Sequence, residues 1–154
     1  MLEITLVHQI PFPGFSELKE QSKLEGYRFV IRLEREWESG QNTYNQAGEG
    51  LFKVVAHHQI VGVGGINHDP YSNDRKIGRI RRFYILPSWR NQGIGTALLE
   101  HILRTKGSEY AMIQLRTDSE LGSKFYERNG FSKVEHKAHY THQLLVADTG
   151  GYLS

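Results

Sequence analysis

The chain has 154 residues and a mass of 17.7 kDa, which is the size of one compact domain. Its 19 Lys and Arg residues against 17 Asp and Glu residues give a net charge of +2, which is too balanced for a strongly basic nucleic-acid-binding module. The chain has no cysteine, which excludes a disulfide framework, a zinc site with thiolate ligands and a cysteine nucleophile.

The first residues, MLEITLVHQI, lack the basic stretch and the long apolar run of a signal peptide. No run of apolar residues approaches the length of about 18 that a membrane span requires. We therefore expect a cytoplasmic protein without a membrane anchor, folded as a single domain over residues 1–154.

The first third of the chain predicts one strand and two helices. Leu2–His8 alternates apolar and polar residues, which is the pattern of a half-buried strand. Two helical patterns follow over Phe15–Leu24 and Tyr27–Glu38, the second with its apolar residues on one face. The polar, glycine-containing stretch Gly40–Gly50 predicts a loop.

The middle of the chain predicts three strands. Leu51–Ala56 and Ile60–Ile66 are apolar runs around a short turn at His57–Gln59, which predicts a hairpin. The polar run Asn67–Lys76 has the composition of a loop, and Ile77–Leu86 reads as a further strand.

The last third of the chain alternates helices and strands. The expected elements are a helix over Thr96–Arg104, a strand over Ala111–Leu115, a helix from Thr117 to Asn129, and strands over Phe131–Glu135 and His139–Val146. Thr117 and Glu120 have the spacing of a capping box, and Gly130 is placed to end the same helix in the left-handed conformation. The alternation favours an α/β fold with a mixed sheet between helices.

A strand, a glycine-containing turn and a helix follow one another directly between residues 77 and 103. Gly93 and Gly95 have no Cβ, so the chain can turn tightly and expose its amides at the start of the helix near Thr96. These amides and the helix dipole favour a phosphate or pyrophosphate, to which Arg90 would add a cation. The turn has neither the dinucleotide fingerprint nor the nucleoside-triphosphate loop motif, and a tight turn without a ligand is the alternative.

Two motifs in this half of the chain resemble the GNAT superfamily of N-acetyltransferases. The run RNQGIG, residues 90–95, is similar to the acyl-CoA pyrophosphate motif R/Q-x-x-G-x-G/A of that family. The run GSKFYERNGF, residues 122–131, is similar to the family's helix-to-strand signature A-x-x-F-Y-x-x-x-G-F. The resemblance implies an α/β fold with a splayed mixed sheet, flanked by helices, that opens beside the Ile77–Leu86 strand.

The resemblance also implies acetyl-CoA as the acyl donor. The pantetheine arm would lie along the strand at Phe83–Ile85, where an amide near Ile85 would stabilise the oxyanion of the thioester. The diphosphate would lie on the amides of Asn91–Thr96, and Ser119, where many relatives have Asn, could contact the pantetheine arm. The residues expected to bind the donor are Phe83, Tyr84, Ile85, Arg90, Asn91, Gln92, Gly93, Ile94, Gly95, Thr96, Ser119 and Gly122.

Tyr126 matches the family's tyrosine, which implies that it is the general acid that protonates the departing thiolate; a packed helix tyrosine is the alternative reading. The resemblance identifies no general base, because Arg79 stands where many family members have a glutamate, and a cation cannot accept a proton. His68, Asp69 and Glu36 are the candidate substitutes, and an amine that arrives neutral needs no base.

Two further groupings carry little functional signal. His136, His139 and His142 resemble a metal cluster, but residues three apart on a strand face opposite sides, so we expect no metal site. Arg81 and Arg82 belong to a basic segment, yet strand alternation would send them to opposite faces. An RNA-linked substrate stays open on this basis, although we expect no nucleic-acid partner.

We therefore expect an acetyl-CoA-dependent N-acetyltransferase whose acceptor is an amine of a small molecule or a peptide. The helices between residues 15 and 38 and the loop Asn67–Lys76 would shape the acceptor pocket. The alternatives are an acyl-CoA-binding sensor without turnover and a protein N-terminal or tRNA-directed acyltransferase. The last strand, with Tyr140 and Leu144–Val146, could pair with a second copy to form a homodimer.

Overall fold

The computed structural model of the protein describes residues 2–146, and residues 1 and 147–154 of the expected domain lie outside the described part. The elements are β1 (Leu2–Leu6), α1 (Phe15–Leu24), α2 (Phe29–Ser39), β2 (Gly50–Ala56), β3 (Gln59–His68), β4 (Ile77–Ile85), the short 3₁₀ helix η1 (Pro87–Trp89), α3 (Ile94–Lys106), the 3₁₀ helix η2 (Gly107–Glu109), β5 (Met112–Leu115), α4 (Glu120–Arg128), β6 (Ser132–Lys133) and β7 (His142–Leu145). Apart from the two 3₁₀ helices, this is the predicted order of elements.

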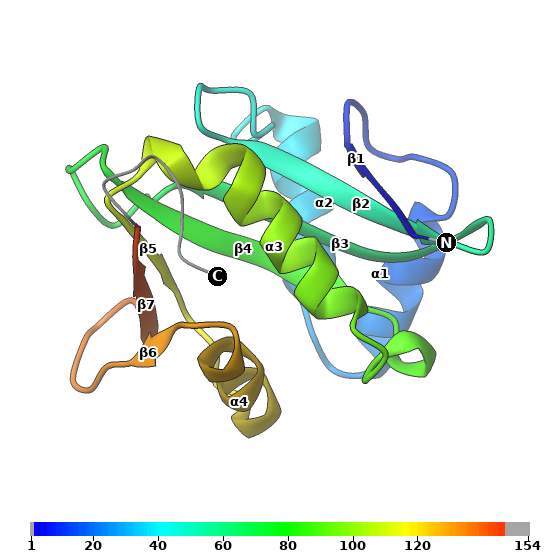
Figure 1. Cartoon of the computed structure of the whole chain (residues 1–154). Coiled ribbons are helices and arrows are strands. Elements are labelled where there is room, and N and C mark those ends of the chain that lie inside the picture. Colours follow the sequence, from blue (N-terminus) through cyan, green and yellow to red (C-terminus); the bar gives the residue numbers. More distant parts are fainter. Residues whose placement is uncertain (1, 147–154) are drawn as a thin grey trace.

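The strands form one mixed sheet in the order β1-β2-β3-β4-β5-β7-β6. Neighbouring strands are antiparallel except β4 and β5, which are parallel. β4 pairs with β5 only where Ile77–Arg79 lies opposite Met112–Gln114, and the two strands then diverge (Figure 1). The sheet is therefore open beside the second half of β4, as the resemblance implied.

Helices cover both faces of the sheet, with α3 in front of it and α1 and α2 behind it in Figure 1. Leu98 and Ile102 of α3 are buried in one apolar cluster with Val54 of β2. Leu18 of α1 and Leu33 of α2 are buried in a second cluster. The fold is thus the expected α/β arrangement of a mixed sheet between helices.

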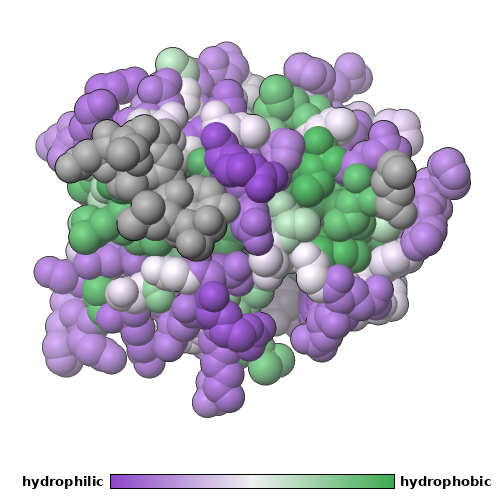
Figure 2. Space-filling model, in the orientation of Figure 1, coloured by the Kyte–Doolittle hydropathy of each residue, from purple (hydrophilic) through white to green (hydrophobic). Residues whose placement is uncertain are grey.

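The outer surface on the α3 side is mostly hydrophilic, with apolar atoms gathered over β1 (Figure 2). Leu2 and Leu6 of β1 are among the large apolar residues that are exposed. Between residues 2 and 146, no helix is long and apolar enough to cross a membrane.

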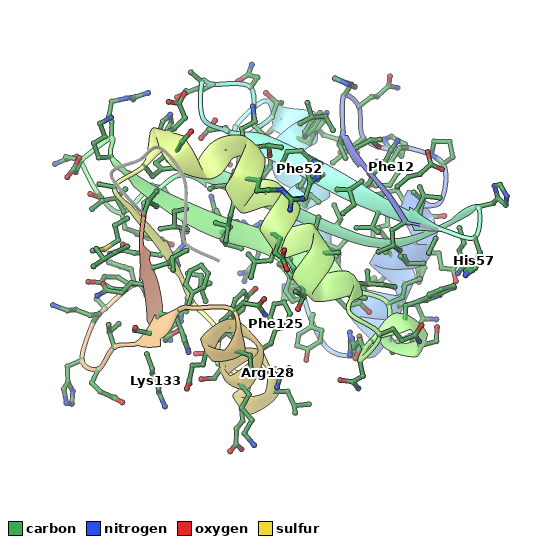
Figure 3. The ribbon with its side chains drawn as sticks, in the orientation of Figure 1. Phe12, Phe52, His57, Phe125, Arg128 and Lys133 are labelled. Atoms are coloured by element: carbon green, nitrogen blue, oxygen red, sulfur yellow. The ribbon has the colours of Figure 1, made fainter. Side chains whose placement is uncertain are left out.

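β2 and β3 form the predicted hairpin, but its turn is shorter than predicted. Gln59 already pairs with Ala56, so the turn consists of His57 and His58 alone. Both histidines have a positive φ, 49° and 66°, which is the geometry of the two-residue hairpin turn that matches strand twist. His57 lies exposed at the tip of the hairpin (Figure 3).

The helices lie close to their predicted bounds. α1 has the predicted ends, and α2 begins at Phe29, two residues later than predicted. α3 begins at Ile94, two residues before the predicted Thr96, because Gly93 in the left-handed conformation (φ 82°) serves as its N-cap. The helix therefore starts inside the glycine turn.

The two ends of α4 differ in how well they were predicted. The capping box of Thr117 and Glu120 is wrong, because the N-cap is Ser119, whose Oγ accepts a hydrogen bond from the Gly122 amide at 3.1 Å. The predicted terminator is confirmed: Gly130 has a φ of 95°, and the amide after it donates to the Tyr126 carbonyl at 3.0 Å.

The last two strands are shorter than predicted. The chain between β6 and β7 leaves the sheet, with His136 in the left-handed region at a φ of 61°. β7 lies between β5 and β6, so Leu144 already pairs with a residue of β5. The expected dimer contact through Tyr140 and Leu144–Val146 stays a prediction.

β4 contains a bulge that the sequence did not predict. Val63 of β3 pairs with Tyr84, whereas Gly65 pairs with Arg81, so one extra residue of β4 faces β3. Arg82 in this bulge has a φ of 54°, a conformation that residues other than glycine rarely adopt.

Because of the bulge, Arg81 and Arg82 reach the same carboxylate on α2. A guanidinium nitrogen of Arg81 lies 3.9 Å from Glu36, and one of Arg82 lies 3.0 Å from it. The prediction that the two arginines point to opposite faces is therefore wrong, because it assumed an uninterrupted strand.

Candidate functional site

The amides of the turn between η1 and α3 have no hydrogen-bond partner within residues 2–146. Among the described residues, no acceptor takes a hydrogen bond from the amides of Asn91–Thr96, and the next amide, of Ala97, donates to the Gly93 carbonyl at 3.0 Å. Asn91 and Gly93 both have a positive φ, which bends the chain here. These amides lie at the positive end of the 13-residue helix α3, which is a setting that favours an anion.

Arg90 lies beside this turn, but its guanidinium is already paired. Its Nη1 and Nη2 donate to the two carboxylate oxygens of Glu25 at 2.8 and 2.7 Å, and its Nε donates to the Ile85 carbonyl at 2.9 Å. Tyr84 donates its hydroxyl to the same carboxylate, and the hydrogen bond from Arg90 lowers the pKa of Glu25. Arg90 thus connects the end of α1, β4 and the turn, and its contact with the donor stays a prediction.

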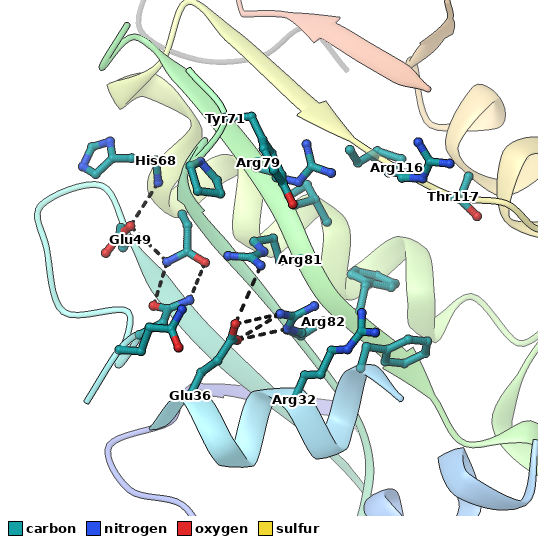
Figure 4. A pocket seen from close by; sticks show the side chains of 18 of the residues that line it. Arg32, Glu36, Glu49, His68, Tyr71, Arg79, Arg81, Arg82, Arg116 and Thr117 are labelled. Atoms are coloured by element: carbon teal, nitrogen blue, oxygen red, sulfur yellow. Dashed lines mark hydrogen bonds and ion pairs between the residues drawn. The ribbon is translucent and has the colours of Figure 1, made fainter. Parts of the chain in front are cut away.

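A cavity of about 1210 Å³ lies beside the middle of β4. It is lined by α2, the loop before β2, the end of β3, residues 79–83 of β4 and the segment between β5 and α4 (Figure 4). Of the predicted site residues, Phe83, Ser119 and Tyr126 line it, whereas the turn Arg90–Thr96 does not. α2 and the loop 67–76 contribute to its wall as expected, but α1 does not.

Tyr126 of α4 lies at the opening in the sheet. Its ring packs against Phe83 and Phe131, with centroids 6.1 and 5.7 Å apart, and the residue is 8% exposed. Burial raises the pKa of Tyr126 above its ordinary value, so the phenol keeps its proton at neutral pH. Within residues 2–146 its hydroxyl makes no hydrogen bond, which leaves the proton available for donation.

Close packing explains two of the glycines predicted at the site. A Cβ at Gly95 would lie 3.1 Å from the Phe125 ring, so the first turn of α3 packs directly on α4. A Cβ at Gly122 would lie 2.6 Å from Thr117 Oγ1. The absence of a Cβ at Gly122 therefore lets the backbone of α4 approach the Thr117 side chain.

The candidate bases differ in how far other groups occupy them. Glu36 accepts hydrogen bonds from Arg82 at 3.0 Å, and Asp69 is buried 3.5 Å from Arg79. His68 lines the cavity; its Nε2 lies 3.3 Å from an Arg75 guanidinium nitrogen, and its buried Nδ1 has no hydrogen-bond partner among the described residues. His68 thus keeps one ring nitrogen without a partner in this part of the chain.

Arg79, at the position where the resemblance places a glutamate, is buried and held in place. Its Nη2 donates to the His139 carbonyl at 2.7 Å, and its guanidinium lies 5.0 Å from the centre of the Tyr71 ring. Burial lowers the pKa of Arg79, but a guanidinium remains charged at neutral pH. No proton acceptor therefore stands at this position.

The histidines that resembled a metal cluster in the sequence have different surroundings in the structure. His139 lies outside β7 and stacks on Tyr71 at 4.1 Å, whereas His142 is buried beside Ser123, with 2.9 Å between Nε2 and Oγ. In the described part of the chain, no group of three or more His, Asp or Glu residues could hold a metal ion.

Sequence reasoning missed a polar network at one end of the cavity. Asn42 and Asn67 exchange two hydrogen bonds of 3.0 Å, and Glu49 accepts from the Asn67 side chain and the His68 amide, also at 3.0 Å. Asn67 is 3% exposed. An amide side chain at the end of the apolar run VGVGGI was the signal in the sequence that could have indicated this network.

The match to a known family agrees with this geometry. Residues 48–133, more than half of the chain, match the acetyltransferase (GNAT) domain. The protein therefore belongs to the GNAT acetyltransferase family, as its two motifs implied.

Individual relatives are similar to this chain over most of its length. N-alpha-acetyltransferase 30 of Schizosaccharomyces pombe is 25% identical over 112 residues, which are 71% of this chain and 73% of that protein. A protein of Exiguobacterium sp. 255-15 assigned as an acetyltransferase is 28% identical, with a TM-score of 0.85 over 97% of this chain and 95% of its own. The PaiA N-acetyltransferase of Thermoplasma acidophilum, solved in complex with coenzyme A, shares the fold at 18% identity and a TM-score of 0.68, over 94% of this chain and 99% of its own.

Proposed function

We propose that the protein transfers an acetyl group from acetyl-CoA to a primary amine by direct attack of the amine on the thioester. The observation that carries this proposal is the row of amides at Asn91–Thr96, which have no hydrogen-bond partner in the described part of the chain and lie beside the open half of β4. These amides fit the diphosphate of coenzyme A. The pantetheine arm would enter the opening between β4 and β5 along Phe83–Ile85, where Ser119 lines the cavity opposite.

In this reaction the lone pair of the amine nitrogen forms a bond to the thioester carbonyl carbon, and the carbon–sulfur bond breaks. The amine loses one proton and the thiolate of coenzyme A gains one, so the products are an amide and a thiol. No bond to the protein forms, in agreement with a chain that has no cysteine. An amide of β4 near Ile85 would stabilise the oxyanion that develops on the carbonyl oxygen.

We assign Tyr126 as the donor of the proton to the thiolate. Three observations support this role: its place in the cavity wall, its contact with Phe83, and its raised pKa, which keeps the phenol protonated. For the amine proton, the route is His68 through water or direct loss to solvent, because the carboxylates of Glu36 and Asp69 face arginines.

Calorimetric titration with acetyl-CoA tests the proposal at the turn. Gly93 and Gly40 both have a φ near +80° and open space where a Cβ would lie, so alanine strains the backbone similarly at either position. We expect Gly93→Ala to weaken acetyl-CoA binding about tenfold, because about 1–2 kcal/mol of strain falls on the binding turn. Gly40→Ala should lower stability by a similar amount and leave this binding unchanged. Equal effects of the two variants on binding would contradict the proposal.

A second candidate function, an acyl-CoA sensor without turnover, is favoured by one observation. Arg79 is buried where many family members carry a glutamate, so a cation stands in place of that proton acceptor. Assays for free coenzyme A thiol with a panel of amines separate the two candidates. Binding of acetyl-CoA without thiol release for any amine would support the sensor.

A further inference from the structure

The cavity wall carries more arginines than carboxylates. Its five arginines are Arg32, Arg79, Arg81, Arg82 and Arg116, and its three carboxylates are Glu36, Glu49 and Asp118. Two of the carboxylates are engaged away from β4. Glu49 accepts from the Asn67 side chain and the His68 amide, and the exposed Asp118 lies 3.3 Å from the Arg116 guanidinium.

Three of the arginines gather around the third carboxylate, Glu36. Arg81 and Arg82 both pair with it, and their side chains are only 17% and 12% exposed. Arg32 lies one turn before Glu36 on the same face of α2, and its guanidinium makes no hydrogen bond or ion pair with any residue from 2 to 146 (Figure 4). Three cations against one anion leave an excess of positive charge. Burial reduces screening by solvent at Arg81 and Arg82, whereas Arg32 is exposed.

We propose that Arg32, Arg81 and Arg82 bind the acidic end of the acceptor, so that the acceptor is a primary amine that also carries a carboxylate or a phosphate. This inference rests on the proposed function and names the substrate class for it. Guanidinium groups bind both anions through paired hydrogen bonds. Glu36 fixes the orientation of two of the three groups and leaves their combined charge positive.

The position of these arginines also limits the size of the acceptor. Arg82 directly precedes Phe83, and the expected thioester position near Ile85 lies three residues along β4 from Arg82, which is roughly 10 Å in a strand. An acceptor held at both ends therefore has only a few bonds between its amine and its acidic group. The same charges would repel a polycationic acceptor such as spermidine.

Matched amines that differ in charge test this inference. We would compare γ-aminobutyrate with γ-aminobutyramide, and phosphoethanolamine with ethanolamine, with spermidine as the cationic amine, by kcat/KM from thiol release. We expect the acidic member of at least one pair to be preferred about tenfold, which corresponds to about 1.4 kcal/mol. The pair that shows the preference separates a carboxylate acceptor from a phosphate acceptor, and added salt should reduce it.

Variants on α2 show whether the arginines cause the preference. Arg32→Gln should reduce the preference for the acidic amine about tenfold, mainly through KM, and Arg32→Lys should retain most of it. Arg35→Gln is the matched control, since Arg35 is exposed on the same helix and does not line the cavity. Neutral or cationic amines as the best acceptors, or equal effects of Arg32→Gln and Arg35→Gln, would overturn the inference while the transferase function stands. Acetyl-CoA binding without thiol release for any amine would instead reject the transferase function, and this inference with it.

Discussion

The surroundings of Tyr126 determine the properties of its phenol. The rings of Phe83 and Phe131 hold the phenol at the opening in the sheet and exclude water from most of it. The resulting rise in the pKa of Tyr126 means that the group carries its proton throughout the neutral range. A buried phenol without a hydrogen-bond acceptor among residues 2–146 is suited to donate that proton to a thiolate.

Replacement of Tyr126 by phenylalanine tests this role. The change keeps the packed ring and removes only the hydroxyl, so we expect thermal stability to stay close to that of the wild type. Because general acid catalysis contributes about 10²–10⁴-fold, kcat should fall at least about a hundredfold. The KM for acetyl-CoA should change little, as Tyr126 is not expected to bind the diphosphate. Steady-state kinetics would decide, and an unchanged kcat would remove Tyr126 from the mechanism.

Glu25 is expected to affect acetyl-CoA binding indirectly, through its contact with Arg90. Its carboxylate holds the Arg90 guanidinium by two hydrogen bonds, and Arg90 in turn holds the Ile85 carbonyl next to the turn Asn91–Thr96. We expect Glu25→Gln to weaken acetyl-CoA binding about two- to fivefold, the effect of a partly exposed ion pair worth about 0.2–1 kcal/mol. The value of kcat at saturating acetyl-CoA should stay unchanged, which separates positioning from chemistry.

Glu17→Gln provides the control for Glu25→Gln. Glu17 is an exposed acidic residue in the first turn of α1, at the opposite end of that helix from Glu25. Calorimetry with acetyl-CoA should show the loss only for Glu25→Gln. Equal affinities for both variants would mean that Arg90 keeps the turn in place without its carboxylate partner.

At the scale of elements, the bulge in β4 decides which side chains face the cavity. It sends Arg81 and Arg82 towards Glu36 on α2 and Phe83 towards α4, where its ring lies 5.8 Å from that of Phe125. Gly64 of β3 lies opposite the bulge, and a Cβ there would come within 2.7 Å of the Phe83 ring. The bulge and the glycine are therefore two parts of one arrangement.

Gly64→Ala should disturb this arrangement. We expect the variant to lose about 1–3 kcal/mol of unfolding free energy, because the added methyl group overpacks the site. Gly107→Ala is the matched control, since its Cβ would meet no atom closer than 3.8 Å and its φ of −62° is helical. This control should be neutral or stabilising by about 0.4–1 kcal/mol. Chemical denaturation measures both, and equal stabilities of the two variants would contradict the close approach.

The sequence predicted the elements better than the contacts between them. Periodicity located α1, and the two glycines located the turn before α3, because both signals depend on residues close together in the chain. The pair of Arg90 and Glu25 joins residues 65 apart, and no local pattern predicts it. The bulge at Arg82 was not predicted either, since arginine carries no signal for a positive φ and the reason for the bulge lies in the facing strand.

At the scale of the whole molecule, α4, which carries Tyr126, lies at the opening in the sheet and is joined to β7 through His142. His142 is 1% exposed, its Nε2 lies 2.9 Å from Ser123 Oγ of α4, and its Nδ1 lies 2.8 Å from Thr141 Oγ1. Burial lowers the pKa of His142, so the imidazole is neutral in the folded protein at neutral pH. The attachment of α4 thus depends on an uncharged histidine.

This dependence predicts how stability changes with pH. In the unfolded chain a histidine takes up a proton below about pH 6.5, whereas folded His142 does so only at lower pH. The unfolded state then binds more protons, so the unfolding free energy should fall as the pH decreases from about 7 to about 5.

His142→Gln keeps a polar side chain but cannot titrate, and it should reduce this slope of unfolding free energy against pH. Exposed His8 offers the control variant His8→Gln, which should retain the wild-type slope. Urea denaturation at several pH values measures each slope, and a His142→Gln slope equal to that of the wild type would assign the pH dependence to other groups, such as His101, whose pKa burial also lowers.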